Sequence, residues 1–238
     1  MLSSRVFVLG AALLPVAWVG AEPAPVGGHW EGAIHAPVED VVVAVDLALD
    51  ESGKLAGTFS NPGQKLNGFP LWSASVEGEV VKLELKTADP GVRTFDGKLS
   101  ADGQKITGQF LIDVHAVPFT LMRNGAARIA PAPRSAALDA KLVGSWVGSL
   151  DYGGQLLPLK LTLTNHADAT ATGTWATGGG PPTPIAIEYV GGSLTLTSPI
   201  APATFTGTVN AQATEIAGAL LEGGKSRPVV FTRVGAGS

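Results

Sequence analysis

One pattern of residues occurs twice along the chain, so any fold proposed for it must be built twice. The motif Gly-x-Trp-x-Gly begins at Gly28 and again at Gly144, and each copy runs on to an arginine, Arg123 or Arg233. The first landmarks lie 116 residues apart and the last 110, with their order kept. A repeat of about 110 residues is far too long for a solenoid unit or a propeller blade and matches a small domain. We therefore expect two tandem domains of the same kind.

The segments outside the repeats have distinct compositions. The chain begins with Arg5 ahead of an apolar run that ends in small residues, as in a secretory signal peptide. The residues between the repeats are rich in alanine and proline and show no apolar period, as in a linker. The expected divisions are 1–21 for the signal peptide, 22–27 for an N-terminal lead, 28–123 for the first repeat, 124–141 for the linker and 142–234 for the second repeat.

The leader sequence and the net charge limit where the protein can be located and which classes of partner it can bind. The apolar run of about 15 residues is shorter than the ~20 that a spanning helix needs, so export is favoured over a membrane anchor. The chain has no cysteine to carry a lipid or form a disulfide. Removal of the leader leaves 15 basic against 20 acidic side chains, a net charge of −5 without a basic cluster. We expect a periplasmic or extracellular protein whose mature form binds neither nucleic acid nor membrane.

A period of two dominates both repeats. In VVVAVDLALD, residues 41–50, large apolar side chains alternate with residues that include Asp46 and Asp50, which predicts strands with one buried and one solvated face. Turn signals separate runs of about 6 to 10 residues and imply antiparallel hairpins. The expected strands of the first repeat lie near 29–36, 40–50, 53–60, 69–76, 79–87, 92–100, 105–114 and 116–123. Eight such strands can close into an up-and-down barrel without an exposed edge.

The repeated tryptophan and arginine suggest how each barrel closes. If the first and last strands lie side by side and antiparallel, the start of one meets the end of the other. A guanidinium stacked on an indole there would gain about 0.5–2 kcal/mol by cation–π attraction. The residues expected to form the two closures are Gly28, Trp30 and Arg123 in the first repeat, and Gly144, Trp146 and Arg233 in the second.

This pattern resembles the lipocalin-like, or calycin, barrels, in which Gly-x-Trp on the first strand packs against an arginine from the last. The longer run from Trp30 to Arg123 also looks like the accessory β-domain that precedes the catalytic domain of many exported bacterial serine hydrolases. Here a second copy stands where the hydrolase domain would follow. The resemblance implies two small lipocalin-like barrels in tandem.

The barrel interiors determine whether a ligand can bind. Eight strands enclose just enough space for packed side chains or for one small ligand. A filled core and an apolar cavity are both open. The side chains expected to line such a cavity are Val43, Val45, Leu83, Phe95, Phe110 and Phe119.

Catalytic motifs of the hydrolases are missing from the sequence, which contains neither Gly-x-Ser-x-Gly nor Ser-x-x-Lys. The acidic residues Asp46, Asp50, Glu84 and Asp96 alternate with core positions and are expected to face water.

One rim of the first barrel would bring His35 and His115 together near Glu39 and Asp113. A metal or acid–base site there is the alternative to a solvated rim.

The favoured interpretation is an exported, non-enzymatic protein without a cofactor or metal, which binds a small apolar ligand or another exported protein. The alternatives are a metal-dependent or other enzyme site at the barrel rim, and a structural partner of a separately encoded hydrolase. The sequence does not rank the ligand and partner hypotheses.

Overall fold

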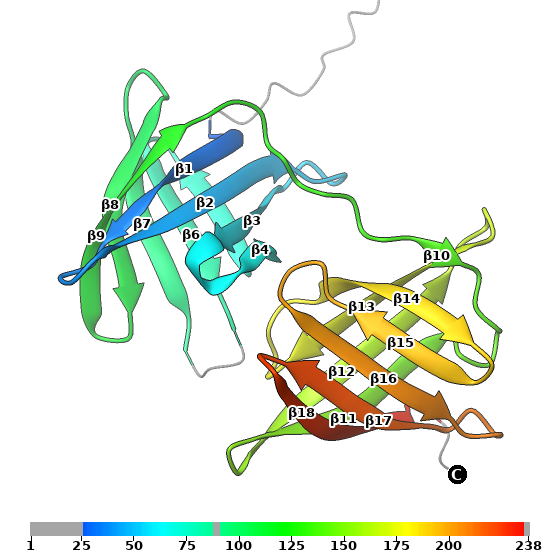
Figure 1. The fold of residues 1–238 in the computed structure, drawn as a ribbon. Coiled ribbons are helices and arrows are strands. Elements are labelled where there is room, and N and C mark those ends of the chain that lie inside the picture. The colour runs from blue at the N-terminus through cyan, green and yellow to red at the C-terminus, as the bar shows by residue number, and fades with distance from the viewer. Residues whose placement is uncertain (1–25, 88–90, 236–238) are drawn as a thin grey trace, which may run out of the picture.

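The computed structural model describes residues 26–87 and 91–235 as two all-β bodies joined by a linker (Figure 1). The signal peptide predicted for residues 1–21 lies outside the described residues. The one helical element in the described ranges is η1, a 3-10 turn at Pro62–Gln64. Within these ranges, no helix is long and apolar enough to cross a membrane. The all-β prediction is confirmed, with two tandem antiparallel sheets.

The first body is a nine-stranded sheet in the order β4-β3-β2-β1-β9-β8-β7-β6-β5. Its strands are β1 (Gly28–His35), β2 (Asp40–Leu49), β3 (Leu55–Asn61), β4 (Leu66–Pro70), β5 (Ser73–Glu77), β6 (Val80–Leu85), β7 (Arg93–Leu99), β8 (Lys105–Ile112) and β9 (His115–Arg123). Strands β1 and β9 pair antiparallel, with Trp30 opposite Arg123. The first and last strands are therefore neighbours.

The predicted fourth strand of the first repeat, residues 69–76, is broken in the structure. Strand β4 pairs with β3, whereas β5 pairs with β6, and the two edge strands share no ladder. The change of partner falls between adjacent residues: the Leu71 N–H donates to Gly57 O, and the Trp72 N–H donates to Glu84 O. The expectation of eight strands in a closed barrel is thus wrong for the first repeat, which forms a curled, open sheet of nine.

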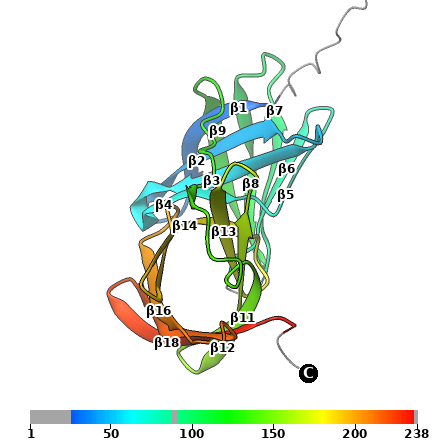
Figure 2. The same cartoon turned by 90° about the vertical axis from the view of Figure 1, so that its right-hand side faces the viewer.

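The second body is a closed barrel. Its strands are β11 (Gly144–Tyr152), β12 (Gln155–Asn165), β13 (Thr170–Thr177), β14 (Thr183–Val190), β15 (Ser193–Thr197), β16 (Ala203–Val209), β17 (Glu215–Glu222) and β18 (Lys225–Arg233). Each pairs with its neighbours in the chain, β11 pairs with β18, and β13 pairs with β14, so eight strands form a complete ring (Figure 2). The eight-stranded antiparallel barrel predicted from the alternation is confirmed here.

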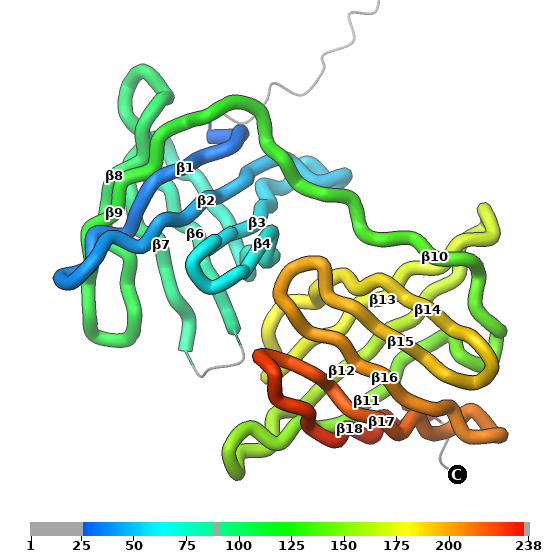
Figure 3. The backbone as a smooth tube through the Cα atoms, viewed as in Figure 1, coloured from blue at the N-terminus to red at the C-terminus, as the bar shows by residue number. Residues whose placement is uncertain are grey.

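The chain between the two bodies runs along the second barrel before entering it (Figure 3). A short strand, β10 (Ser135–Ala136), pairs with β13 and adds a ninth member to the edge of this sheet. Leu138 and Leu142 then join the buried apolar cluster of the second barrel. The end of the alanine- and proline-rich segment is therefore packed against the second barrel.

Each body has its own apolar core of inward-facing side chains. Trp30 is fully buried in the first core and Trp146 in the second. The Trp30 indole N–H donates to Val26 O at 2.9 Å, and the Trp146 indole N–H donates to Leu142 O at 3.0 Å. The polar atom of each indole is thereby satisfied inside an apolar core, as burial requires.

One of the acidic residues expected to face water is covered. Asp46 is only 6% exposed because residues just after β9 cross over it: its carboxylate accepts from the Arg128 backbone N–H at 2.6 Å and contacts His29 Nδ1 at 2.8 Å. The His29 Nε2 atom lies 2.8 Å from Glu31 Oε1. The alternation of apolar and polar residues correctly predicts that Asp46 lies on the outer face of the sheet. The segment that follows β9 covers that part of the face and so buries the side chain.

Candidate functional site: a cavity at one end of the second barrel

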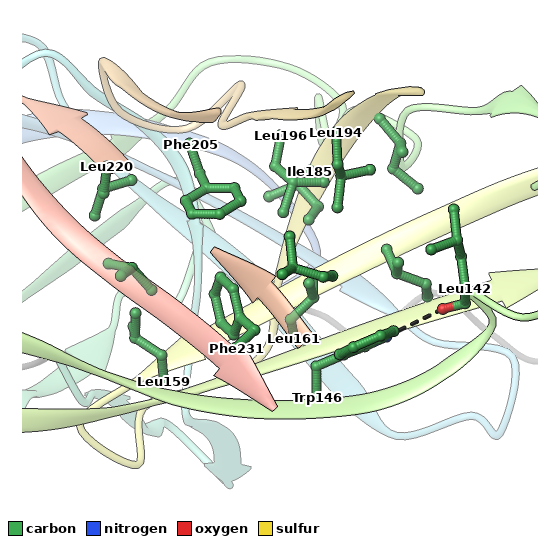
Figure 4. Close-up of a cluster of buried hydrophobic side chains, with 14 of the residues drawn as sticks. Leu142, Trp146, Leu159, Leu161, Ile185, Leu194, Leu196, Phe205, Leu220 and Phe231 are labelled. Carbon is green, nitrogen blue, oxygen red and sulfur yellow. Dashed lines mark hydrogen bonds between the residues drawn. The ribbon is translucent and has the colours of Figure 1, made fainter. Parts of the chain in front are cut away.

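The second barrel contains a cavity of about 370 Å³ at the end opposite the Trp146–Arg233 contact. Strands β11, β12, β13, β14, β16, β17 and β18 all contribute side chains to it. Its apolar wall from the second repeat includes Leu150, Leu157, Leu159, Trp175, Phe205, Leu220, Val229 and Phe231. In Figure 4 the labelled members Leu159, Phe205, Leu220 and Phe231 all lie to the left of Trp146. A volume of this order is in the range of small-molecule sites.

The first repeat completes the wall. Five of its residues line the cavity: Gln64, Leu66, Phe69, Lys86 and Thr87. They come from η1, from β4 and from the segment that follows β6. The site is therefore composite and depends on how the two bodies meet.

Two close contacts hold the bodies together at this point. The Asn67 backbone N–H donates to Ile200 O at 2.7 Å. The backbone of Gly180 approaches the Lys86 carbonyl so closely that a Cβ atom at Gly180 would lie 2.9 Å from its oxygen. Both contacts are made by main-chain atoms, so they do not depend on the conformations of the side chains.

The two contacts are related by the repeat. By strand order, the loop before β4 corresponds to the loop before β14, and the loop after β6 corresponds to the loop after β15. Asn67, in β4 just after the first kind of loop, meets Ile200 of the second kind, and Lys86 of the second kind meets Gly180 of the first. Equivalent surfaces thus meet reciprocally, as in the two-fold interface of a homodimer.

Charged and aromatic side chains gather at the mouth of the cavity. The Arg227 Cζ atom lies 4.4 Å from the centre of the Tyr152 ring, and Arg227 Nη1 lies 3.6 Å from Glu222 Oε2. That Nη1 atom is buried and has no hydrogen-bond partner among the described residues. Lys86 Nζ lies 4.4 Å from the centre of the Trp72 ring. An apolar chamber with cations at its mouth suits an apolar ligand with one polar end.

The side chains predicted to line a cavity in the first repeat all belong to the buried apolar cluster of the first body. Phe95 lies 4.5 Å from Phe110 and 5.0 Å from Phe119, measured between ring centres. None of the six predicted residues lines the cavity of the second barrel. All are 5% exposed or less: Val43, Val45, Leu83, Phe95, Phe110 and Phe119.

Matched interior positions of the two repeats differ in side-chain size. At the offset of 110 residues, Phe110 corresponds to Leu220 and Phe119 corresponds to Val229. Two phenylalanines are thus replaced by smaller side chains that line the cavity, whereas the lining residue Phe231 replaces the smaller Leu121. Comparison of matched interior positions therefore does not by itself predict which repeat has room for a ligand.

The residues expected to close the barrels lie as follows. In the first repeat the Arg123 Cζ atom is 4.4 Å from the centre of the Trp30 indole, and Arg123 donates from Nε to Gly103 O at 2.8 Å and from Nη1 to Gly27 O. Gly28 has a φ of +144°, and a Cβ atom there would lie 2.7 Å from Arg123 Nη1.

The second repeat repeats this arrangement more loosely. The Arg233 Cζ atom is 5.3 Å from the centre of the Trp146 indole, and the guanidinium donates to Lys141 O and Val143 O. Gly144 has a φ of +129° and a wider gap to Arg233, 3.4 Å from a Cβ atom to Nη2.

The rim of the first body does not form the metal site considered as an alternative. His35 contacts Asp40 through Nδ1 at 3.1 Å and Thr120 through Nε2 at 3.2 Å. In the part of the chain that the structure describes, no group of three or more His, Cys, Asp or Glu side chains could hold a metal ion. His115 and His35 are thus not brought into one ligand cluster.

The fold and cavity define an all-β protein of two barrel-like repeats with a composite pocket. No protein-family model matches the sequence, and no curated protein matches it significantly. Solved structures with a distant likeness include a candidate outer membrane protein from Bacteroides fragilis, at 13% identity and a TM-score of 0.27, over 88% of this chain and 98% of that one. A DUF3598-family protein of unknown function from Nostoc punctiforme has 13% identity and a TM-score of 0.25, over 87% of this chain and 96% of that one.

The isotype 1 transferrin-binding protein B of serogroup B Neisseria meningitidis has 13% identity and a TM-score of 0.25 over 87% of this chain. The chain spans 57% of the length of that protein. At these scores the likenesses carry no argument about function, so the site itself must supply it.

Proposed function

We propose that the chain is an exported, non-enzymatic binding protein that holds a small apolar ligand in the cavity of its second barrel. The observation that carries this proposal is a chamber of about 370 Å³ whose lining residues are mostly apolar, among them five leucines and three phenylalanines. Burying an apolar ligand there would gain roughly 25 cal/mol per Å² of apolar surface removed from water. The signal-like leader and the lipocalin-like Gly-x-Trp and arginine pattern of each repeat support the same role.

The test uses N-phenyl-1-naphthylamine, an uncharged apolar fluorophore, and the full chain without its leader. Val229→Phe places in the cavity the residue that the first repeat holds at the matched position. The added ring occupies the chamber, so the probe's affinity is expected to fall at least tenfold. Val230→Phe is the matched control, because Val230 lies on the outer face of the same strand and is 47% exposed.

Two results would contradict the proposal. One is the absence of any saturable binding by the wild-type protein. The other is an equal loss of binding in Val229→Phe and Val230→Phe, with both variants folded by circular dichroism. Either result would leave interaction with another exported protein as the function to pursue, and pull-down of a separately encoded hydrolase would then test that role.

A further inference from the structure

The cation that the first repeat contributes to the cavity has no acidic partner. Lys86 lines the chamber from the segment after β6, and its ammonium lies over the Trp72 ring at 4.4 Å. Among the described residues, no carboxylate lies within ion-pairing distance of it, in contrast to Lys82 on β6, which lies 3.3 Å from Glu84. A lysine at an apolar chamber thus keeps its charge available for a ligand.

The acidic residue of the chamber does not cancel this charge. Glu222 faces Arg227, with 3.6 Å between Oε2 and Nη1, and Arg227 itself retains a buried N–H without a hydrogen-bond partner. Lys86 and Glu222 line the chamber and Arg227 contacts Glu222, so the three side chains together carry one net positive charge. In surroundings of low polarity, such a charge favours an anion more strongly than it would in water.

The main chain around Lys86 fixes its place relative to the chamber. Its carbonyl oxygen lies against Gly180, where a Cβ atom would come within 2.9 Å, and the neighbouring contact joins Asn67 to Ile200. The charge of Lys86 is therefore supplied by the first repeat and most of the apolar wall by the second.

We propose that the two repeats form one site for a single-chain anionic amphiphile, whose apolar chain occupies the second barrel and whose anionic head group is held by Lys86 of the first. This inference rests on the proposed binding function and names the class of its ligand. A carboxylate and a phosphate monoester share the chemistry that an ammonium recognises, a compact negative charge with strong acceptor oxygens.

The experiment measures displacement of N-phenyl-1-naphthylamine by four ligands with the same ten-carbon chain: decanoate, decyl phosphate, decanol and decyltrimethylammonium. The wild-type protein is expected to bind one of the anions about tenfold more tightly than decanol, and the stronger anion identifies the head group. Lys86→Gln should abolish that preference and leave the affinity for decanol within twofold. Lys82→Gln, the same change on the adjoining strand, should retain the preference.

Each remaining outcome overturns the inference. Equal affinity for anionic, neutral and cationic chains would leave the binding function standing and remove the role of Lys86. A preference for anions that survives Lys86→Gln would place the head group elsewhere. Failure of every ligand, together with failure of the fluorophore itself, would overturn the binding function and this inference with it.

Discussion

Arg123 lies over Trp30, with its Cζ atom 4.4 Å from the centre of the indole, and so joins the last strand of the first repeat to the first. The guanidinium also donates to two main-chain carbonyls, Gly27 O and Gly103 O. Because the indole is fully buried, removal of the cation would open its face to water and leave these carbonyls without their donor.

Arg123→Ala is expected to lower the free energy of unfolding of the first body by about 2–4 kcal/mol, combining the lost cation–π contact with the lost charged hydrogen bonds. Urea unfolding followed by circular dichroism measures this. Arg134→Ala is the control, since Arg134 forms an exposed pair with Asp168 and should change stability by less than about 1 kcal/mol. Equal effects of the two substitutions would contradict a structural role for the closure.

Gly32, the last glycine of the first Gly-x-Trp-x-Gly motif, lies where the neighbouring strand leaves no room. A Cβ atom there would come 1.9 Å from Thr120 O, which is main chain and cannot move without displacing β9. Gly32→Ala should therefore destabilise the protein by about 2–4 kcal/mol. Gly63→Ala, where the nearest atom would be 3.4 Å away, should stay within about 0.5 kcal/mol of wild type in the same thermal unfolding experiment.

The carboxylate of Glu31 makes stability depend on pH. Hydrogen bonds from His29 and then Asn124 hold the pKa of Glu31 below its ordinary value of 4.5. A depressed folded-state pKa gives stability that is present above the unfolded-state pKa and is lost as the pH falls through the folded-state value. The difference in stability between wild type and Glu31→Gln should thus be constant above about pH 5 and shrink below pH 4.5.

Urea unfolding at intervals between pH 3 and pH 7 checks this dependence. Asn124→Ala removes one of the two hydrogen-bond donors and should weaken it. A difference between wild type and Glu31→Gln that stays unchanged down to pH 3 would show that the Glu31 contacts do not persist in solution.

The fold was largely predictable because alternation of apolar and polar residues reports directly which face of a strand is buried. Alternation does not report hydrogen-bond partners, so although Pro70 marks a break in the run from Phe69 to Glu77, it does not show that the chain changes neighbour between Leu71 and Trp72. Alternation also does not report which segments cross the outer face of a sheet. The burial of Asp46 by the residues after β9 was therefore not predicted.

The cavity and the meeting of the two repeats depend on finer differences. Replacement of Phe119 by Val229 is visible in the sequence, but whether neighbouring side chains fill the space is decided only by packing. The contact between Asn67 and Ile200 is made by main-chain atoms, so the amino-acid sequence contains no side-chain pattern that would predict it. The composite site therefore needed the structure.

The contact of Gly180 with Lys86 gives a direct test of how the repeats meet. A Cβ atom at Gly180 would lie 2.9 Å from Lys86 O, and the added methyl groups of Gly180→Val would extend the clash into the first body. The barrel itself should remain folded, because Gly180 lies between β13 and β14 and not within a strand. Small-angle X-ray scattering should thus show a larger radius of gyration for the variant, with an unchanged far-ultraviolet circular dichroism spectrum.

Separation of the repeats should also affect the site that they share. In Gly180→Val the chamber would lose the wall supplied by Leu66, Phe69 and Lys86, so N-phenyl-1-naphthylamine should bind more weakly than to wild type. Gly63→Val is the matched control, since Gly63 lies in η1 of the same interface region but does not line the chamber, and the nearest atom to a Cβ there is Asn61 Oδ1 at 3.4 Å. If Gly180→Val leaves both the radius of gyration and the affinity unchanged, the two bodies are not held together through this contact in solution, and the ligand site belongs to the second barrel alone.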